Sequence, residues 1–114
     1  MPKYDLEDRT EKFSLDVIRF CKNIPQDTVT RPLISQLVRS ATSVGANYRE
    51  ANGANSKKDF ANKIYICKKE AKESRYWIGI LEKSIASPPP ETTFLIDEAQ
   101  QLVLIFSKIA SNSK

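Results

Sequence analysis

The feature that most constrains the fold is an uninterrupted heptad pattern between residues 57 and 85. Apolar or small residues recur there at alternating spacings of four and three: Phe60, Ile64, Cys67, Ala71, Ser74, Ile78, Leu81 and Ile85. A repeat of about 3.5 residues predicts a helix that packs its seam against neighbours in a left-handed bundle. Because a helix of this length is not stable alone in water, its partners must lie elsewhere in the chain or in another subunit.

Three further amphipathic stripes supply these partners. Each places apolar residues on one helical face, and the stripes are Phe13, Val17, Phe20, Ile24; Leu37, Ala41, Val44, Tyr48; and Leu95, Ala99, Leu102, Phe106, Ile109. Asn52-Gly53 favours a left-handed helix end, and Ser56 to Asp59 has the form of a capping box that begins the next helix. We therefore predict helices at about residues 5–23, 31–51, 57–84 and 93–111.

The connections between these helices are short, and short connections make consecutive helices antiparallel neighbours. The predicted fold class is all-α, an up-down-up-down antiparallel four-helix bundle that forms a single domain over residues 1–114. The six prolines agree with this assignment, because none falls inside a predicted helix and Pro32 lies in a first turn, where its missing N–H costs nothing.

The sequence shows no sign of export or membrane insertion. Residues 1–9 are charged, unlike a signal peptide, and no uncharged apolar run approaches the length of a membrane span. Cys21 and Cys67 lie far apart, each on an apolar stripe, which favours core packing over a disulfide or a metal site. We expect a cytoplasmic protein with no membrane partner.

The absence of histidine limits the possible catalytic machinery. Without histidine the chain cannot form a Ser-His-Asp or Cys-His nucleophile, and Glu70 and Glu73 lack the Glu-x-x-His pairs of a di-metal carboxylate bundle. The glycine at position 53 is not followed by the Lys-Ser or Lys-Thr of a phosphate-binding loop. The sequence therefore predicts no enzyme, no cofactor, no metal and no small-molecule substrate; the alternative is a subunit of an enzyme completed in trans.

The net charge of the chain is concentrated between residues 57 and 83. This segment carries eight Lys and Arg against four Asp and Glu, whereas the flanking segments are close to neutral. One face of the predicted helix combines lysine and tyrosine at helical spacing: Tyr65, Lys69, Lys72, Tyr76, Gly79 and Lys83. Such a stripe is able to hold phosphates and stack bases of RNA or DNA. The alternatives are a solvated face and a contact between subunits.

Two other groups of residues indicate contacts between helices or subunits. If the helical hairpin turns near residue 54, Arg39 lies level with Glu70 and Gln36 with Glu73, which predicts a polar network that fixes helix register. Ile66, Trp77 and Ile80 form an additional apolar face that one small bundle cannot cover. We therefore expect a homo-oligomer with Trp77 at its interface.

Three stretches resemble a known family: residues 36–50 (QLVRSATSVGANYRE), 56–60 (SKKDF) and 67–77 (CKKEAKESRYW). They are similar to bacterial four-helix-bundle proteins first noticed as reading frames in intervening sequences of 23S rRNA genes. Where many relatives have Glu-Gly, this chain has Glu50-Ala51, which moves the helix end slightly.

The resemblance implies an up-down-up-down bundle, a ring-like homopentamer and no established enzymatic activity. A related branch is the accessory protein of diversity-generating retroelements, a basic pentamer associated with a reverse transcriptase and nucleic acid. The sequence-based hypothesis is therefore a non-catalytic homo-oligomeric scaffold that binds RNA, DNA or a ribonucleoprotein. The alternative hypothesis is a protein-binding adaptor with no nucleic-acid role.

Overall fold

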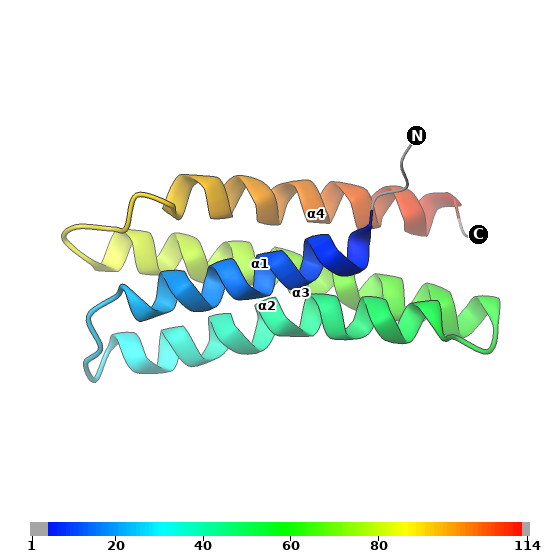
Figure 1. Ribbon diagram of the computed structural model, residues 1–114, viewed down its shortest axis with the longest axis horizontal. Coiled ribbons are helices and arrows are strands. Elements are labelled where there is room, and N and C mark those ends of the chain that lie inside the picture. The colour runs from blue at the N-terminus through cyan, green and yellow to red at the C-terminus, as the bar shows by residue number, and fades with distance from the viewer. Residues whose placement is uncertain (1–4, 113–114) are drawn as a thin grey trace.

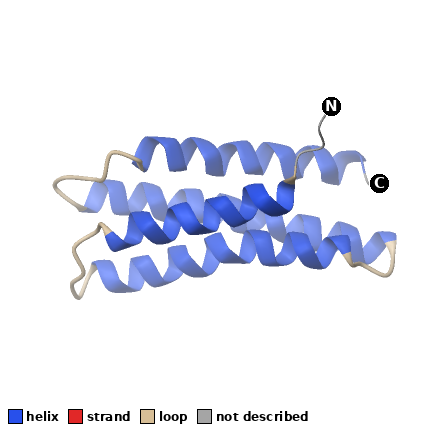
Figure 2. Cartoon of the chain, in the orientation of Figure 1, coloured by secondary structure: helices blue, strands red, loops and turns tan. Residues whose placement is uncertain are grey.

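The structure, a computed structural model, describes residues 5–112. These residues form four α-helices: α1 (Leu6–Lys22), α2 (Thr30–Asn52), α3 (Lys57–Ser84) and α4 (Thr92–Asn112). Consecutive helices run antiparallel with their turns at alternating ends (Figure 1). Helices account for all the regular structure within the described residues, and loops join them (Figure 2). The predicted all-α, up-down-up-down bundle is confirmed, and each helix end differs from the expected position by one residue at most.

The central element is α3, which packs along both α2 and α4, while α1 packs along α2 and less extensively along α4. The heptad seam of α3 faces the core, as its spacing predicts. Six seam residues are fully buried: Ile64, Cys67, Ala71, Ser74, Ile78 and Leu81. Burying one large aliphatic side chain contributes about 1.5–3 kcal/mol, so this seam supplies much of the stabilisation of the bundle.

The other three helices cover the seam with the stripes identified in the sequence. Phe13 and Phe20 of α1 and Phe106 of α4 are almost completely buried. The ring of Phe106 lies 5.9 Å from that of Tyr48 on α2, in a tilted arrangement typical of packed aromatic pairs. A single apolar core therefore runs along the bundle.

Side-chain hydrogen bonds to backbone N–H groups stabilise the N-terminal ends of helices. The Ser56 hydroxyl accepts a hydrogen bond from the backbone N–H of Asp59 at 3.0 Å, which is the predicted cap of α3. Before α2, the Asp27 carboxylate accepts from the N–H groups of Val29 and Thr30, both at 2.8 Å. The hydrogen bond from Thr30, followed by that from Val29, lowers the pKa of Asp27 below its ordinary value.

The left-handed ending expected at Gly53 is wrong. Gly53 has φ near −100°, and its N–H donates to the carbonyl of Glu50 at 3.1 Å. The next N–H, that of Ala54, donates to the carbonyl of Ala51 at 3.1 Å. Helix α2 therefore ends by tightening its last turn, which satisfies two terminal carbonyls without a positive φ.

Gly45 allows α1 and α2 to approach closely. A Cβ atom at this position would lie 3.1 Å from Thr10 Oγ1 on α1. The Thr10 hydroxyl is itself held in place, because it donates to the Leu6 carbonyl at 2.7 Å. Gly45 is thus required by packing inside the bundle.

Both cysteine thiols should be inert in the native protein. Burial raises the pKa of Cys21 to about 11 and that of Cys67 to about 12, so both remain protonated near neutral pH. We expect alkylation of either thiol, followed by mass spectrometry at pH 8, only after unfolding in urea. Because the native pKa values exceed the ordinary value of 9.0, the stability that these thiols contribute is complete below pH 9 and falls as pH rises toward 11. Rapid native-state alkylation would contradict their burial.

Candidate nucleic-acid interface

The predicted lysine and tyrosine stripe lies on one continuous outer face of α3. Tyr65 is 63% exposed and Tyr76 is 59% exposed, which is high for aromatic side chains in a single chain. The three predicted lysines, Lys69, Lys72 and Lys83, are also exposed. Two cations outside the predicted stripe, Lys68 and Arg75, lie on the same side of the helix. We call these seven residues the basic face: Tyr65, Lys68, Lys69, Lys72, Arg75, Tyr76 and Lys83.

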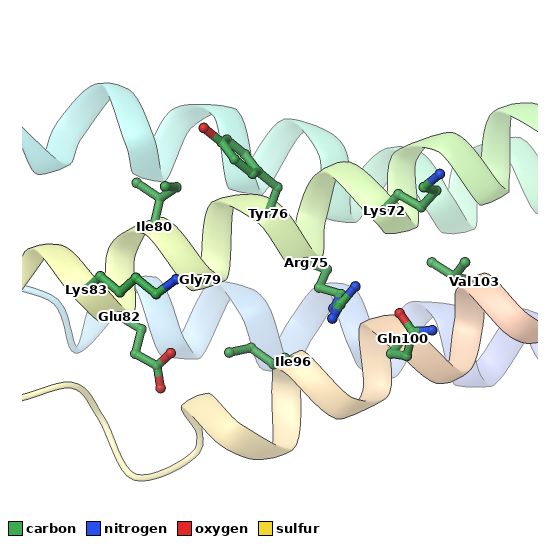
Figure 3. Close-up of a pocket in the computed structure, with 10 residues that line it drawn as sticks. All are labelled: Lys72, Arg75, Tyr76, Gly79, Ile80, Glu82, Lys83, Ile96, Gln100 and Val103. Carbon is green, nitrogen blue, oxygen red and sulfur yellow. The ribbon is translucent and has the colours of Figure 1, made fainter.

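Part of the basic face borders a groove between α3 and α4. The groove has a volume of about 570 Å³ and is lined from α3 by Lys72, Arg75, Tyr76, Gly79, Ile80, Glu82 and Lys83, and from α4 by Ile96, Gln100 and Val103 (Figure 3). Three of these side chains are cationic, and Glu82 alone is acidic. A smaller depression, lined by Tyr65, Lys68, Lys69 and Lys72, adjoins it through Lys72. We call the larger depression the basic groove.

The cations of the basic face are not neutralised within the subunit. Across the described residues, the ion pairs involve other cations, such as Arg9 with Glu98 at 2.8 Å, Arg49 with Glu11 at 3.0 Å and Lys63 with Glu50 at 2.7 Å. No ion pair in residues 5–112 includes Lys68, Lys69, Lys72, Arg75 or Lys83. Their positive charge is therefore available to an external anion.

The predicted polar network lies on another side of α3, against α2. Arg39 donates to the Glu70 carboxylate at 3.2 Å and also to Glu73, and its Nε donates to the amide oxygen of Gln36 at 3.3 Å. Gln36 thus reaches the network through Arg39 rather than through Glu73. Also between α2 and α3, the hydroxyls of Ser40 and Ser74 form a buried hydrogen bond of 2.9 Å.

The network combines a buried carboxylate with a half-exposed cation. The side chain of Glu70 is 8% exposed, and that of Arg39 is 48% exposed. Partial desolvation alone would lower the pKa of Arg39, but the charges of Glu70 and Glu73 together raise it. Arg39 therefore stays charged and compensates the carboxylate beneath it, which fixes the register between α2 and α3.

Replacing Arg39 with alanine should lower the free energy of unfolding by about 1–2 kcal/mol, because the buried Glu70 carboxylate loses its recorded side-chain donor. The partial exposure of Arg39 keeps this cost below that of a fully buried pair. The double variant Arg39→Leu with Glu70→Leu should be more stable than Arg39→Ala, since it leaves no uncompensated charge. Urea denaturation followed by circular dichroism measures both, and an unchanged Arg39→Ala midpoint would show that the pair adds nothing.

The residues predicted at an oligomer interface, Ile66, Trp77 and Ile80, are half-buried in the single chain. Trp77 packs partly on the core, and its Nε1–H donates to Glu73 at 3.3 Å. Ile80 lines the basic groove, so it lies at the border between the two predicted surfaces. We call the surface formed by Ile66, Trp77 and Ile80 the Trp77 surface. The structure thus gathers the tyrosine and lysine stripe on one face of α3, beside the Trp77 surface.

Sequence reasoning missed Lys68, Arg75 and the α4 side of the groove. Lys68 and Arg75 are seven residues apart and each lies three or four residues from Lys72, so helical spacing was a usable signal for both. No sequence signal identified Gln100, because its place depends on how α4 packs against α3. Among residues 5–112 no cluster of Cys, Asp and Glu is arranged to hold a metal ion. None of the described helices is both long and apolar enough to cross a bilayer.

Comparison with known proteins identifies relatives over nearly the whole chain. The sequence profile described as 23S rRNA-intervening sequence protein matches residues 3–108. Among solved structures, the chain is similar to a protein of unknown function from the S23 ribosomal protein family of Bacteroides thetaiotaomicron, with 29% sequence identity and a TM-score of 0.81. The alignment covers 91% of this chain and 96% of the Bacteroides chain. The chain has no match among curated proteins.

Proposed function

The chain belongs to the 23S rRNA-intervening sequence protein family, and we propose that it acts in the cytoplasm as a non-catalytic, homo-oligomeric scaffold that binds RNA through its basic face. The observation that carries this proposal is the set of five cations on one side of α3 that have no acidic partner in the described residues. Phosphate is the anion that such a repeated array of Lys and Arg suits best.

Exposed aromatic residues within the same face favour nucleic acid over other polyanions. Tyr76 lies among the cations and Tyr65 lies at the N-terminal end of the basic face, and both are largely exposed to solvent. A face that combines cations with aromatic rings suits a chain of phosphates and bases, whereas a polyanion without bases gains nothing from the rings. A protein ligand with acidic side chains is the competing occupant, and the salt titration below separates the two.

Oligomerisation would make a weak site effective. A single subunit offers few phosphate contacts, but a ring presents the basic face several times and thereby raises the effective concentration of sites. Exposed apolar residues on other surfaces, including Leu15, Val29 and Leu104, support self-association. A homopentamer is the assembly we propose, with Ile66, Trp77 and Ile80 at its subunit contacts.

Charge reversal of Lys69 and Lys72 to glutamate should weaken RNA binding by at least about tenfold. Each subunit loses two phosphate contacts, and the new carboxylates repel the phosphates. Both lysines are exposed and outside any ion pair in the described residues, so the melting temperature should stay nearly unchanged. Fluorescence anisotropy with a labelled single-stranded RNA of about 20 nucleotides, titrated from about 50 to 200 mM salt, measures the affinity and its salt dependence.

The matched control is the charge reversal of Lys22 on α1 and Lys108 on α4. These two lysines are also exposed and form no ion pair within the described residues, and their reversal changes the net charge by the same amount. We expect the control to retain most of the affinity. If both pairs weaken binding equally, or if the parent protein shows no salt-sensitive binding, the basic face is not an RNA site.

Replacing Trp77 with alanine should dissociate the oligomer more than it unfolds each subunit, because a large aromatic anchor is lost from the proposed interface. Light scattering of the parent should give a mass about five times the 12.9 kDa of one chain, and the variant a smaller mass. Circular dichroism measures helicity in parallel. A monomeric parent at micromolar concentration, or an equal loss of mass and helicity in the variant, would refute this role for Trp77.

A further inference from the structure

The three glycines of the chain lie in different surroundings, and the reason for a glycine differs at each position. Gly45 is required by the contact with Thr10, and Gly53 lies at the end of α2. Gly79 lies inside α3, and a Cβ atom there would meet no atom within 4 Å. A glycine inside a helix is less favourable than alanine, and neither the backbone conformation nor internal packing requires one at position 79. The open space above Gly79 therefore leaves room for close approach by a molecule outside this chain.

The residues around Gly79 indicate the chemistry that such a molecule would need. Gly79 lines the basic groove and lies along α3 between Lys83 and Lys72 (Figure 3). Arg75 points toward α4, while Tyr76 points away from α4 at the other edge of the groove (Figure 3). On α4 the groove is lined by two apolar residues, Ile96 and Val103. An occupant that suits this lining combines an apolar part with flanking negative charge.

We propose that the open backbone at Gly79 seats a base of single-stranded RNA, with the adjacent phosphates held by Lys72, Arg75 and Lys83. The proposal rests on the proposed function, because it specifies which form of RNA the basic face takes. A base in a single strand is free to leave its neighbours and enter a groove of about 570 Å³. In a duplex the bases are paired and stacked inside, so only phosphates would reach this surface.

Two further side chains, those of Gln100 and Tyr65, extend the proposed base-binding position at Gly79. Gln100 has an amide that forms no recorded side-chain hydrogen bond within the described residues, so it is free to bond a base edge or a ribose 2′-hydroxyl. Tyr65 lies eleven residues before Tyr76, about 16 Å along the helix, and Lys68, Lys69, Lys72 and Arg75 lie between them. A strand that stacks on both rings would pass all four cations.

The decisive variant is Gly79→Met, which fills the seat with a good helix former. We expect the melting temperature to be at or above that of the parent, while affinity for a single-stranded RNA of about 20 nucleotides falls at least about fivefold. Gly79→Ala should also raise the melting temperature but weaken binding less. The matched control is Ala46→Met, which adds the same side chain to an exposed position of α2 and should leave binding unchanged.

Tyrosine variants test whether bases are stacked. Tyr76→Leu should weaken binding of the single strand at least about fivefold, whereas Tyr76→Phe should retain it, since only the ring is needed. The control is Phe94→Leu on α4, because Phe94 is 55% exposed, comparable to Tyr76, but lies outside the basic face. We expect this control to bind like the parent.

Trp77 provides an independent readout of base contact. It is the only tryptophan, and its ring lies 5.1 Å from that of Tyr76 in an edge-on arrangement. Single-stranded RNA should change Trp77 emission in the parent and much less in Gly79→Met. Inorganic polyphosphate, which has charge but no bases, should bind without this change.

The outcomes separate this inference from the proposed function. Salt-sensitive binding that is equal for single-stranded RNA and an RNA duplex of the same length, or that survives in Gly79→Met, would overturn the base seat and leave the basic face as an RNA site. Equal affinity for single-stranded DNA of the same sequence would overturn the assignment to RNA. Absence of any salt-sensitive binding by the parent would overturn both proposals.

Discussion

The rest of the structure depends on the burial of one face of α3 between α2 and α4. The seam of this helix is fully buried from Ile64 to Leu81, and removing such a surface from water supplies the main stabilisation of the bundle. A helix that packs against two neighbours buries only part of its circumference. The remaining sides of α3 are held in place by the seam and are only partly covered, and they carry both the basic face and the Trp77 surface.

The charged residues also fall into two groups, those that join helices and those that face solvent. Arg9, Arg39 and Arg49 connect neighbouring helices through carboxylates, and these contacts fix register and neutralise charge. The cations of the basic face do not contribute to such contacts within the described residues, although they lie on the helix with the most extensive packing. In the proposed complex this unpaired positive charge meets the phosphates of RNA, and the open backbone at Gly79 is the proposed point of closest approach.

Residue periodicity predicted the inward face of each helix, because burial repeats with the helical turn. Phe20 and Ile78 were placed in the core on this basis alone. The pairing of Arg39 with Glu70 was predicted by counting residues outward from the turn between α2 and α3. Counting does not say which groups bond: Gln36 joins the network through a hydrogen bond from Arg39, since a side chain's partner depends on rotamers as well as on register. The left-handed end at Gly53 was also wrong, because a tightened last turn satisfied the same carbonyl groups.

The sequence by itself determined the number, order and inward faces of the helices, since these follow from local spacing, caps and breaks along the chain. It also determined that positive charge gathers on α3. Only the tertiary structure decided that Lys72, Arg75 and Gly79 share a groove with Gln100 of α4, because this depends on the rotation of one packed helix against another. Contacts between residues distant in sequence arise from side-chain packing, which no local pattern contains.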